Sequence, residues 1–124
     1  MEKKRILIVD DEPTSTRMTK LVLEQTGDYE VGEENDSVRA LATARAFRPD
    51  IILLDVVMPK LDGGDLASMI QTDPVLGKVP IVFLTALMER GDTGSEVRGG
   101  FRFISKMASK DELITCIETS MSKR

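Results

Sequence analysis

The chain has 124 residues, of which 31% are charged and 41% hydrophobic, a balance that fits one folded domain with its own core. Its 17 basic and 21 acidic residues give a net charge of −4, which argues against nucleic acid as the main partner because phosphate binding needs a basic surface. There is no histidine, which excludes His-based triads and His-ligated metal sites. The apolar runs are too short for a signal peptide or a membrane span, so we expect a cytoplasmic protein with no membrane insertion.

Short apolar runs alternate with helical patterns along the chain. In order, the sequence predicts a strand at 5–9, a helix at 14–26, a strand at 29–31, a helix at 37–47, a strand at 51–54, a helix at 64–72, a strand at 81–84, a crossover at 86–100, a strand at 101–104 and a helix at 110–122. Most of these strands are apolar at consecutive positions, which is typical of parallel strands covered on both faces. The pattern predicts an α/β fold with an open, doubly wound, five-stranded parallel sheet and flanking helices.

The apolar positions of the helices predict which faces pack on the sheet. We expect the core-facing positions, methionines included as core filler, to be Met18, Leu21, Val22, Gln25, Val38, Leu41, Ala42, Ala44, Leu66, Met69, Ile70, Leu113, Ile114, Ile117 and Met121. The single cysteine, Cys116, is expected to be half-buried on the last helix.

The crossover before the last strand is rich in glycine. Four glycines fall within residues 91–100, and each costs about 1 kcal/mol relative to alanine inside a helix. A full helix is therefore not expected there. The sequence leaves three alternatives: a short helix near 86–90, a second helical turn near 94–98, or a loop.

Polar residues follow the strand ends. Asp10 and Asp11 follow the first strand, Asp55 the third, Thr85 the fourth and Lys106 the fifth. Because ligands of such folds bind beyond the carboxyl ends of the strands, we expect these side chains to meet at one edge.

Three carboxylates in one place repel one another by about 4 kcal/mol per pair, at a separation of about 4 Å and an effective dielectric constant of about 20. A hard divalent cation such as Mg²⁺ would offset this repulsion, and a lysine beside it would help to neutralise an incoming phosphoryl group. A carboxylate can itself accept that group as an aspartyl phosphate. Each residue alone has a plainer interpretation: a helix cap, a loop aspartate, a turn hydroxyl or a surface lysine.

Several motifs together resemble the response-regulator receiver domains, including the single-domain chemotaxis-regulator type. They are Ile6-Leu7-Ile8-Val9-Asp10-Asp11-Glu12-Pro13, Asp50-Ile51-Ile52-Leu53-Leu54-Asp55, Met58-Pro59 with Asp62-Gly63, Val79-Pro80-Ile81-Val82-Phe83-Leu84-Thr85-Ala86, and Lys106. The resemblance covers essentially the whole chain and implies a flavodoxin-like (βα)5 fold in one domain, residues 1–124, with no output domain.

The resemblance also implies a role for each site residue. Asp55 would be the phosphoacceptor, and Asp10 and Asp11 would hold Mg²⁺ with Asp55. Val57 would give the metal only its backbone carbonyl. Lys106 would pair with a phosphoryl oxygen.

The resemblance further implies a switch. Thr85 would turn its hydroxyl onto the phosphoryl group, and Phe103 would change rotamer on activation, although plain core packing is the alternative for Phe103. Val57 and Leu87 stand where the family tunes dephosphorylation, and two apolar residues there predict slow decay.

Two departures from the family stand out. Met107 follows Lys106, where the family usually has proline after a cis bond. A cis bond without proline costs about 2.5–4 kcal/mol, so we expect a trans bond, and the resemblance alone then does not fix the position of Lys106. The second departure is the glycine-rich segment 91–100, which lies in the family's signalling face.

The leading hypothesis is a signalling switch. It is not an enzyme beyond its own phosphorylation and dephosphorylation, it takes phosphate from a histidine kinase or a histidine phosphotransfer protein, and it signals through protein contacts. The alternatives are a shuttle or sink for phosphate, a receiver-fold interaction module that works without phosphorylation, and a phosphohydrolase. Val57 disfavours the phosphohydrolase, because it offers no general acid near the nucleophile. Whether the chain forms a homodimer is open.

Overall fold

The computed structural model describes residues 3–86, 95–98 and 100–122. Its elements in chain order are β1 (Lys4–Val9), α1 (Pro13–Glu24), β2 (Tyr29–Glu34), the 3₁₀ helix η1 (Ser37–Arg39), α2 (Ala40–Phe47), β3 (Ile51–Asp55), α3 (Gly63–Thr72), β4 (Ile81–Thr85), β5 (Ser95–Arg98), β6 (Phe101–Ser105) and α4 (Lys110–Ser122). No helix in the described ranges is both long enough and apolar enough to cross a membrane.

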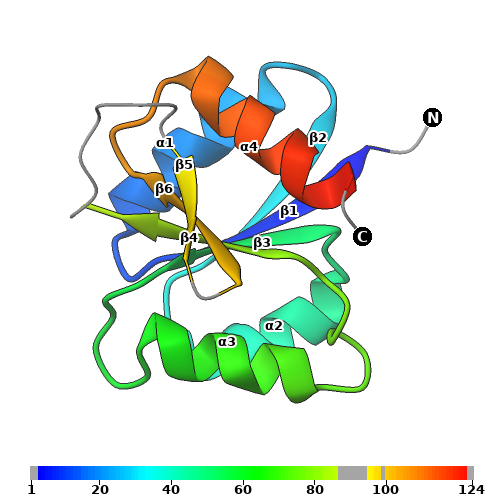
Figure 1. The fold of residues 1–124 in the computed structure, drawn as a ribbon, viewed down its shortest axis with the longest axis vertical. Coiled ribbons are helices and arrows are strands. Elements are labelled where there is room, and N and C mark those ends of the chain that lie inside the picture. Colours follow the sequence, from blue (N-terminus) through cyan, green and yellow to red (C-terminus); the bar gives the residue numbers. More distant parts are fainter. Residues whose placement is uncertain (1–2, 87–94, 99, 123–124) are drawn as a thin grey trace.

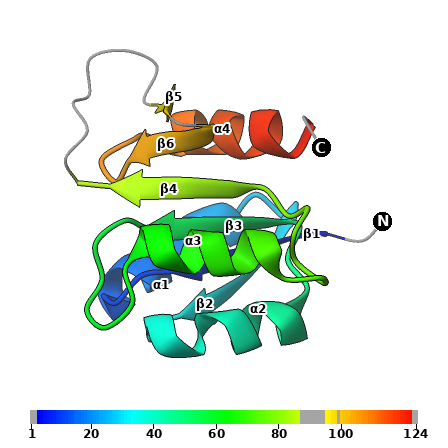
Figure 2. The ribbon, with the colours of Figure 1, turned by 60° about the horizontal axis from the view of Figure 1, so that its bottom comes forward.

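One sheet of six strands runs through the molecule in the order β2-β1-β3-β4-β6-β5 (Figure 2). Five of the strands are parallel, which confirms the predicted doubly wound architecture, and β5 is added antiparallel to β6 at the edge. The central strand β3 is buried along its whole length, as expected for a strand covered on both faces.

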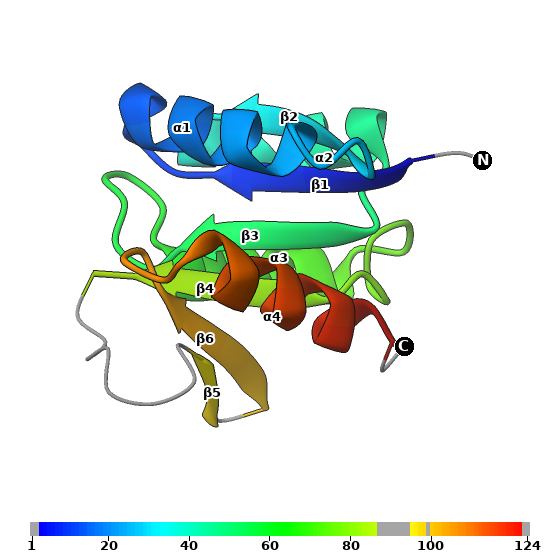
Figure 3. The ribbon, with the colours of Figure 1, turned by 90° about the horizontal axis from the view of Figure 1, so that it is seen from above.

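Two apolar cores cover the two faces of the sheet. Helices α1 and α4 lie on one face and α2 and α3 on the other (Figure 1). Alternate residues of β3 serve the two cores: Ile51 and Leu53 pack on the α1 and α4 side, and Ile52 and Leu54 on the α2 and α3 side. On the face covered by α1 and α4, α1 lies over β1 and β2, and α4 lies over the middle of the sheet (Figure 3).

Parts of the predicted helix faces were wrong. Met18 is 60% exposed, Leu21 51%, Val38 61% and Met69 41%, and Gln25 and Ala42 are exposed as well, so none of these side chains fills the core. In α1 the buried positions are instead Thr16 and Leu23. Thr16 can be buried because its hydroxyl donates to the carbonyl of Pro13 and to the carboxylate of Glu33, at 3.1 and 2.9 Å. Cys116 is fully buried, not half-buried, and burial raises the pKa of its thiol.

The crossover before β6 differs from the alternatives that the sequence left open. The helical turn expected near 94–98 was wrong, because Ser95–Arg98 forms β5 and pairs with Phe101–Ser105. Gly100, at a φ of +86°, stands between the two strands in a conformation that favours glycine. The short helix expected near 86–90 falls from residue 87 onward outside the described residues, as does Leu87.

Candidate functional site

The acidic residues sit where β1 and β3 end. Asp10 directly follows β1 and is fully buried, and Asp55 is the last residue of β3 and is 5% exposed. The Asp10 amide donates to the carbonyl of Glu34 on β2 at 3.1 Å, and one Asp10 carboxylate oxygen accepts the amide of Glu12 at 3.1 Å. Asp10 is thus fixed by the sheet on one side and by the start of α1 on the other.

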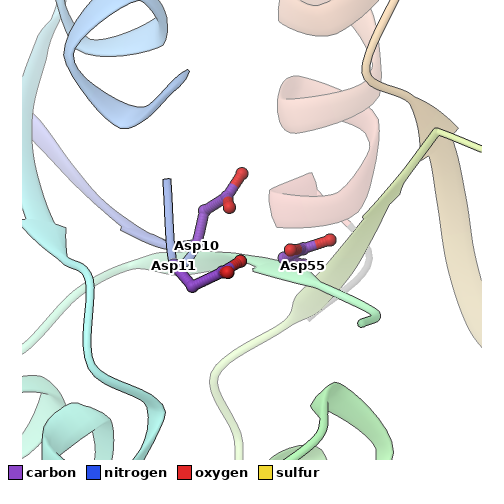
Figure 4. A group of neighbouring side chains, drawn as sticks. All are labelled: Asp10, Asp11 and Asp55. Carbon is purple, nitrogen blue, oxygen red and sulfur yellow. The ribbon is translucent and has the colours of Figure 1, made fainter. Parts of the chain in front are cut away.

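The structure brings Asp10, Asp11 and Asp55 together (Figure 4). One carboxylate oxygen from each lies within 4.8 Å of those of the other two, and Asp11 is the most exposed of the three. Three hard oxygen donors at this separation fit a divalent cation such as Mg²⁺, which binds proteins through a few carboxylates and keeps part of its water shell. Val57 lies two residues beyond Asp55 with its side chain 70% exposed.

Lys106 closes the other side of the acidic cluster. Its Nζ lies 3.0 Å from Oδ2 of Asp10 and 3.3 Å from Oδ1 of Asp55. The Lys106 amide donates to the carbonyl of Thr85 at 2.9 Å, which extends the pairing of β4 and β6 by one residue. The chain contains no cis peptide bond within its described part, so the bond to Met107 is trans, as expected, and Lys106 still reaches the cluster.

Burial and charge shift the titration of this cluster. Burial raises the pKa of Asp55 to about 6, the charge of Asp10 adds to the rise, and Lys106 opposes it. Burial disfavours the charged form of Lys106 and lowers its pKa. The hydrogen bonds and ion pairs with Asp10 and Asp55 favour the charged form more strongly, so the pKa of Lys106 is raised overall. At neutral pH the site therefore holds an ionised Asp55 beside a charged lysine.

The two predicted switch residues lie on the neighbouring strands β4 and β6. Thr85 ends β4 and is the strand partner of Ser105. Phe103 is half-buried and stacks on Phe83, with ring centroids 5.0 Å apart and planes at 24°. Phe83 and Thr85 are two residues apart on β4 and therefore point to the same face of the sheet. This packing places Phe103 on the same side of the sheet as Thr85.

Sequence analysis missed supporting residues around the site. The Asn35 side-chain amide donates to the backbone carbonyl of Asp10 at 2.8 Å and to the hydroxyl of Thr16 at 3.1 Å. The buried Ser37 donates to the carbonyl of Pro59 at 3.0 Å and so ties η1 to the loop after β3. Asn35 follows β2 as Asp10 follows β1, but the second strand was predicted only at 29–31, so no sequence signal marked Asn35 as a strand-end residue.

A third supporting residue is Gly63 at the start of α3. A side chain there would collide with the backbone carbonyl of Asp55 and would come within 2.9 Å of the Cα of Val56. The α3 helix can start this close to the phosphoacceptor candidate only because Gly63 has no Cβ.

The fold and the site together define a receiver domain. The family model for the response regulator receiver domain matches residues 6–118, and the chain belongs to this family. It is 30% identical over 117 residues to the polar-differentiation response regulator DivK of Brucella anthropi, a match that covers 94% of each chain. It is 44% identical over 90 residues to the response regulator PleD of Caulobacter vibrioides, covering 71% of this chain and 19% of PleD.

Solved structures agree with this assignment. The receiver domain of sensor histidine kinase PA1611 from Pseudomonas aeruginosa, solved with a magnesium ion in its active site cleft, superposes with a TM-score of 0.82 at 28% identity, covering 98% of this chain and 99% of that one. The chemotaxis protein CheY4 of Vibrio cholerae gives a TM-score of 0.81 at 25% identity, covering 96% and 99%. The chain spans only about a fifth to a third of the first curated relatives, 19% of PleD and 34% of RpaA from Synechocystis.

Proposed function

We propose that this receiver domain is a Mg²⁺-dependent phosphoacceptor switch in which Asp55 takes a phosphoryl group from a phosphohistidine of a partner protein. The observation that carries the proposal is the contact of one lysine, Lys106, with both Asp10 and Asp55 inside a cluster of three carboxylates. The partner would be a histidine kinase or a histidine phosphotransfer protein, and because such kinases use ATP, we place the reaction in the cytoplasm.

The chemistry is a phosphoryl transfer between two side chains. A carboxylate oxygen of Asp55 attacks phosphorus, the bond from phosphorus to the donor nitrogen breaks, and its electron pair stays on the imidazole, which takes a proton from solvent. With a pKa of about 6, Asp55 is mostly ionised at pH 7 and is available as the nucleophile. Bound Mg²⁺ would supply charge neutralisation for the transferring group, held by Asp10, Asp11, Asp55 and the carbonyl of Val57.

Lys106 and Thr85 act on the phosphorylated form. Lys106 already reaches Asp55 at 3.3 Å, so its ammonium is available to pair with a phosphoryl oxygen placed on that carboxylate. Thr85, at the end of the neighbouring strand, supplies a hydroxyl donor. Val57 presents an exposed apolar side chain beside the site and no group that could activate water, which supports slow loss of the phosphoryl group.

The output of the switch is proposed to be a protein contact. Phe103 stacks on Phe83, two residues from Thr85, so a movement of the Thr85 hydroxyl toward a phosphoryl group would disturb the packing around Phe103. Phe103 lies on β6, which pairs with the edge strand β5. The surface formed by β5, β6 and α4 is therefore the proposed place where a downstream partner senses phosphorylation.

Acetyl phosphate with Mg²⁺ tests the proposal without the natural kinase. Intact mass should show one added phosphoryl group on the wild-type chain, and none on Asp55→Asn or in the presence of EDTA. Asp62→Asn is the matched control, since Asp62 lies outside the cluster and caps α3; it should be phosphorylated like the wild type. A wild-type chain that gains no phosphoryl group would favour an interaction module that works without phosphorylation.

A further inference from the structure

The turn that presents Lys106 contains an amide that the usual family sequence lacks. Proline has no backbone N–H, whereas Met107 has one, and Met107 directly follows Lys106, whose Nζ contacts Asp10 and Asp55. A backbone N–H without an acceptor near the protein interior is costly, so the turn needs a partner for it. The Met107 side chain is 68% exposed and cannot hold the turn by packing.

Ser105 supplies that partner. It is the last residue of β6 and is 2% exposed, and its Oγ accepts the Met107 amide at 2.9 Å. A serine hydroxyl that accepts the amide two residues on forms a side-chain turn in place of a backbone turn.

Three consecutive amides of this turn are hydrogen-bonded. The Lys106 amide donates to the carbonyl of Thr85 at 2.9 Å, and the Ala108 amide donates to the carbonyl of Ser105 at 3.1 Å. The Met107 amide, bound to the Ser105 hydroxyl, lies between them. Of the three, only this middle bond depends on the identity of a side chain.

We infer that Ser105 is a positioning residue for phosphoryl transfer: its hydroxyl does the work that proline does elsewhere in the family, by fixing the turn from which Lys106 reaches Asp10 and Asp55. The inference rests on the proposed function, because Lys106 acts on a phosphoryl group held by Asp55. Ser105 itself acts through the backbone and does not touch the reacting atoms.

Three variants test the inference. Ser105→Ala removes the acceptor, and Ser105→Thr keeps a hydroxyl at the same position. Ser109→Ala is the matched control, because the Ser109 hydroxyl also accepts a backbone amide, that of Glu112 at 3.1 Å, but at the start of α4. All measurements are made well below the unfolding temperature of every variant.

The first measurement is hydrogen exchange of the Met107 amide by NMR, which needs no phosphorylation. We expect Ser105→Ala to speed this exchange about tenfold, since the amide loses its acceptor. Ser105→Thr and Ser109→Ala should exchange like the wild type at this amide. Unchanged exchange in Ser105→Ala would overturn the inference.

The second measurement is the rate of phosphorylation by acetyl phosphate, taken together with the Kd for Mg²⁺ from calorimetry. Ser105→Ala should slow phosphorylation about tenfold, because small displacements of a catalytic group have effects of this size. Its Mg²⁺ affinity should not weaken, because Lys106 is not a metal ligand, and Ser105→Thr should restore the rate. A Ser105→Ala chain phosphorylated at the wild-type rate would overturn the inference and leave the proposed function standing. A wild-type chain that takes no phosphate would refute the proposed function, while amide exchange would still decide whether Ser105 holds the turn.

Discussion

Replacing Asp55 by asparagine should stabilise the protein at neutral pH when no divalent cation is present. Asp55 is 5% exposed, and burial together with Asp10 raises its pKa to about 6 despite the nearby Lys106. Ionising this carboxyl is therefore less favourable in the folded protein than in the unfolded chain, where its pKa is 3.8. Asparagine keeps the size of the side chain and removes the charge.

The size of the effect follows from the pKa difference. A rise from 3.8 to about 6 is about two units, and each unit corresponds to about 1.4 kcal/mol, which gives a ceiling of about 3 kcal/mol. The raised pKa already includes the attraction to Lys106. Burying the N–H donors of asparagine beside the Lys106 ammonium costs part of the gain, so we expect about 1–2 kcal/mol, or about 5 °C in Tm.

The pH dependence gives the test its direction. Between about pH 4 and pH 6 the folded protein binds more protons at Asp55 than the unfolded chain does, so wild-type stability falls as pH rises through this window. Asp55→Asn does not lose stability in this way. Its free energy of unfolding should therefore exceed that of the wild type by almost nothing at pH 4 and by the full difference above pH 6.

Thermal unfolding followed by circular dichroism, in EDTA and from pH 4 to pH 8, measures this difference. Asp62→Asn is the control, because Asp62 caps α3 by accepting the Asp65 amide at 2.9 Å and asparagine caps helices equally well. Added Mg²⁺ should stabilise the wild type more than Asp55→Asn and narrow the gap. An Asp55→Asn protein that is less stable than the wild type at pH 7, or an advantage that does not change with pH, would refute the reasoning.

Three further perturbations follow from the surroundings of the site. Gly63→Ala should destabilise the fold by about 1–3 kcal/mol in urea unfolding, since the added Cβ has no room. Gly64→Ala should stabilise the fold by up to about 1 kcal/mol, because the nearest atom to its added Cβ is 3.5 Å away. Equal effects of the two substitutions would contradict the proposed close approach of α3 to Asp55. Asn35→Ala should weaken Mg²⁺ binding about tenfold in calorimetry, because it frees the loop that carries the acidic residues, and an unchanged Kd would count against this role. The hydrogen bond from Arg45 Nε at 2.7 Å holds the pKa of Asp73 below its ordinary value, so this pair stabilises the fold above that ordinary pKa and loses its effect as pH falls through the lowered one. Arg45→Gln should therefore cost stability at pH 7 and cost progressively less as pH falls below 3.8, and a cost that does not shrink as pH falls below that value would rule the pair out as the cause.

The parts of the fold that sequence analysis predicted well are those in which one physical requirement governs many neighbouring residues. A parallel strand buried on both faces is apolar at nearly every position, so residues 51–54 of β3 and 81–84 of β4 are visible as continuous apolar runs. The meeting of Asp10, Asp55 and Lys106 then follows from topology alone, because parallel strands end at one edge.

The parts that it missed depend on single partners that are distant in the sequence. Thr16 occupies a core position of α1 because Glu33 on strand β2 accepts a hydrogen bond from its hydroxyl, and no periodicity within the helix reveals this. Met18 was expected in the core from its helical spacing with Leu21 and Val22, and it is exposed. Asn35 and Ser37 support the site through hydrogen bonds to backbone carbonyls, which any polar side chain of similar reach could make.

Strand β5 changes how a signal could leave the site. With β5 paired to its outer side, β6 is hydrogen-bonded to a strand on each edge, and Phe103 has Phe83 as its partner on β4 and Glu96 on β5. A rotamer change of Phe103 would therefore take place on a strand whose backbone is held from both sides, and such a change would have to pass to its neighbours through side-chain packing and not through a shift of β6 alone. Since β5 is the last strand of the sheet and Val97 on it is 58% exposed, a partner that senses Phe103 would have to contact the β5 edge as well.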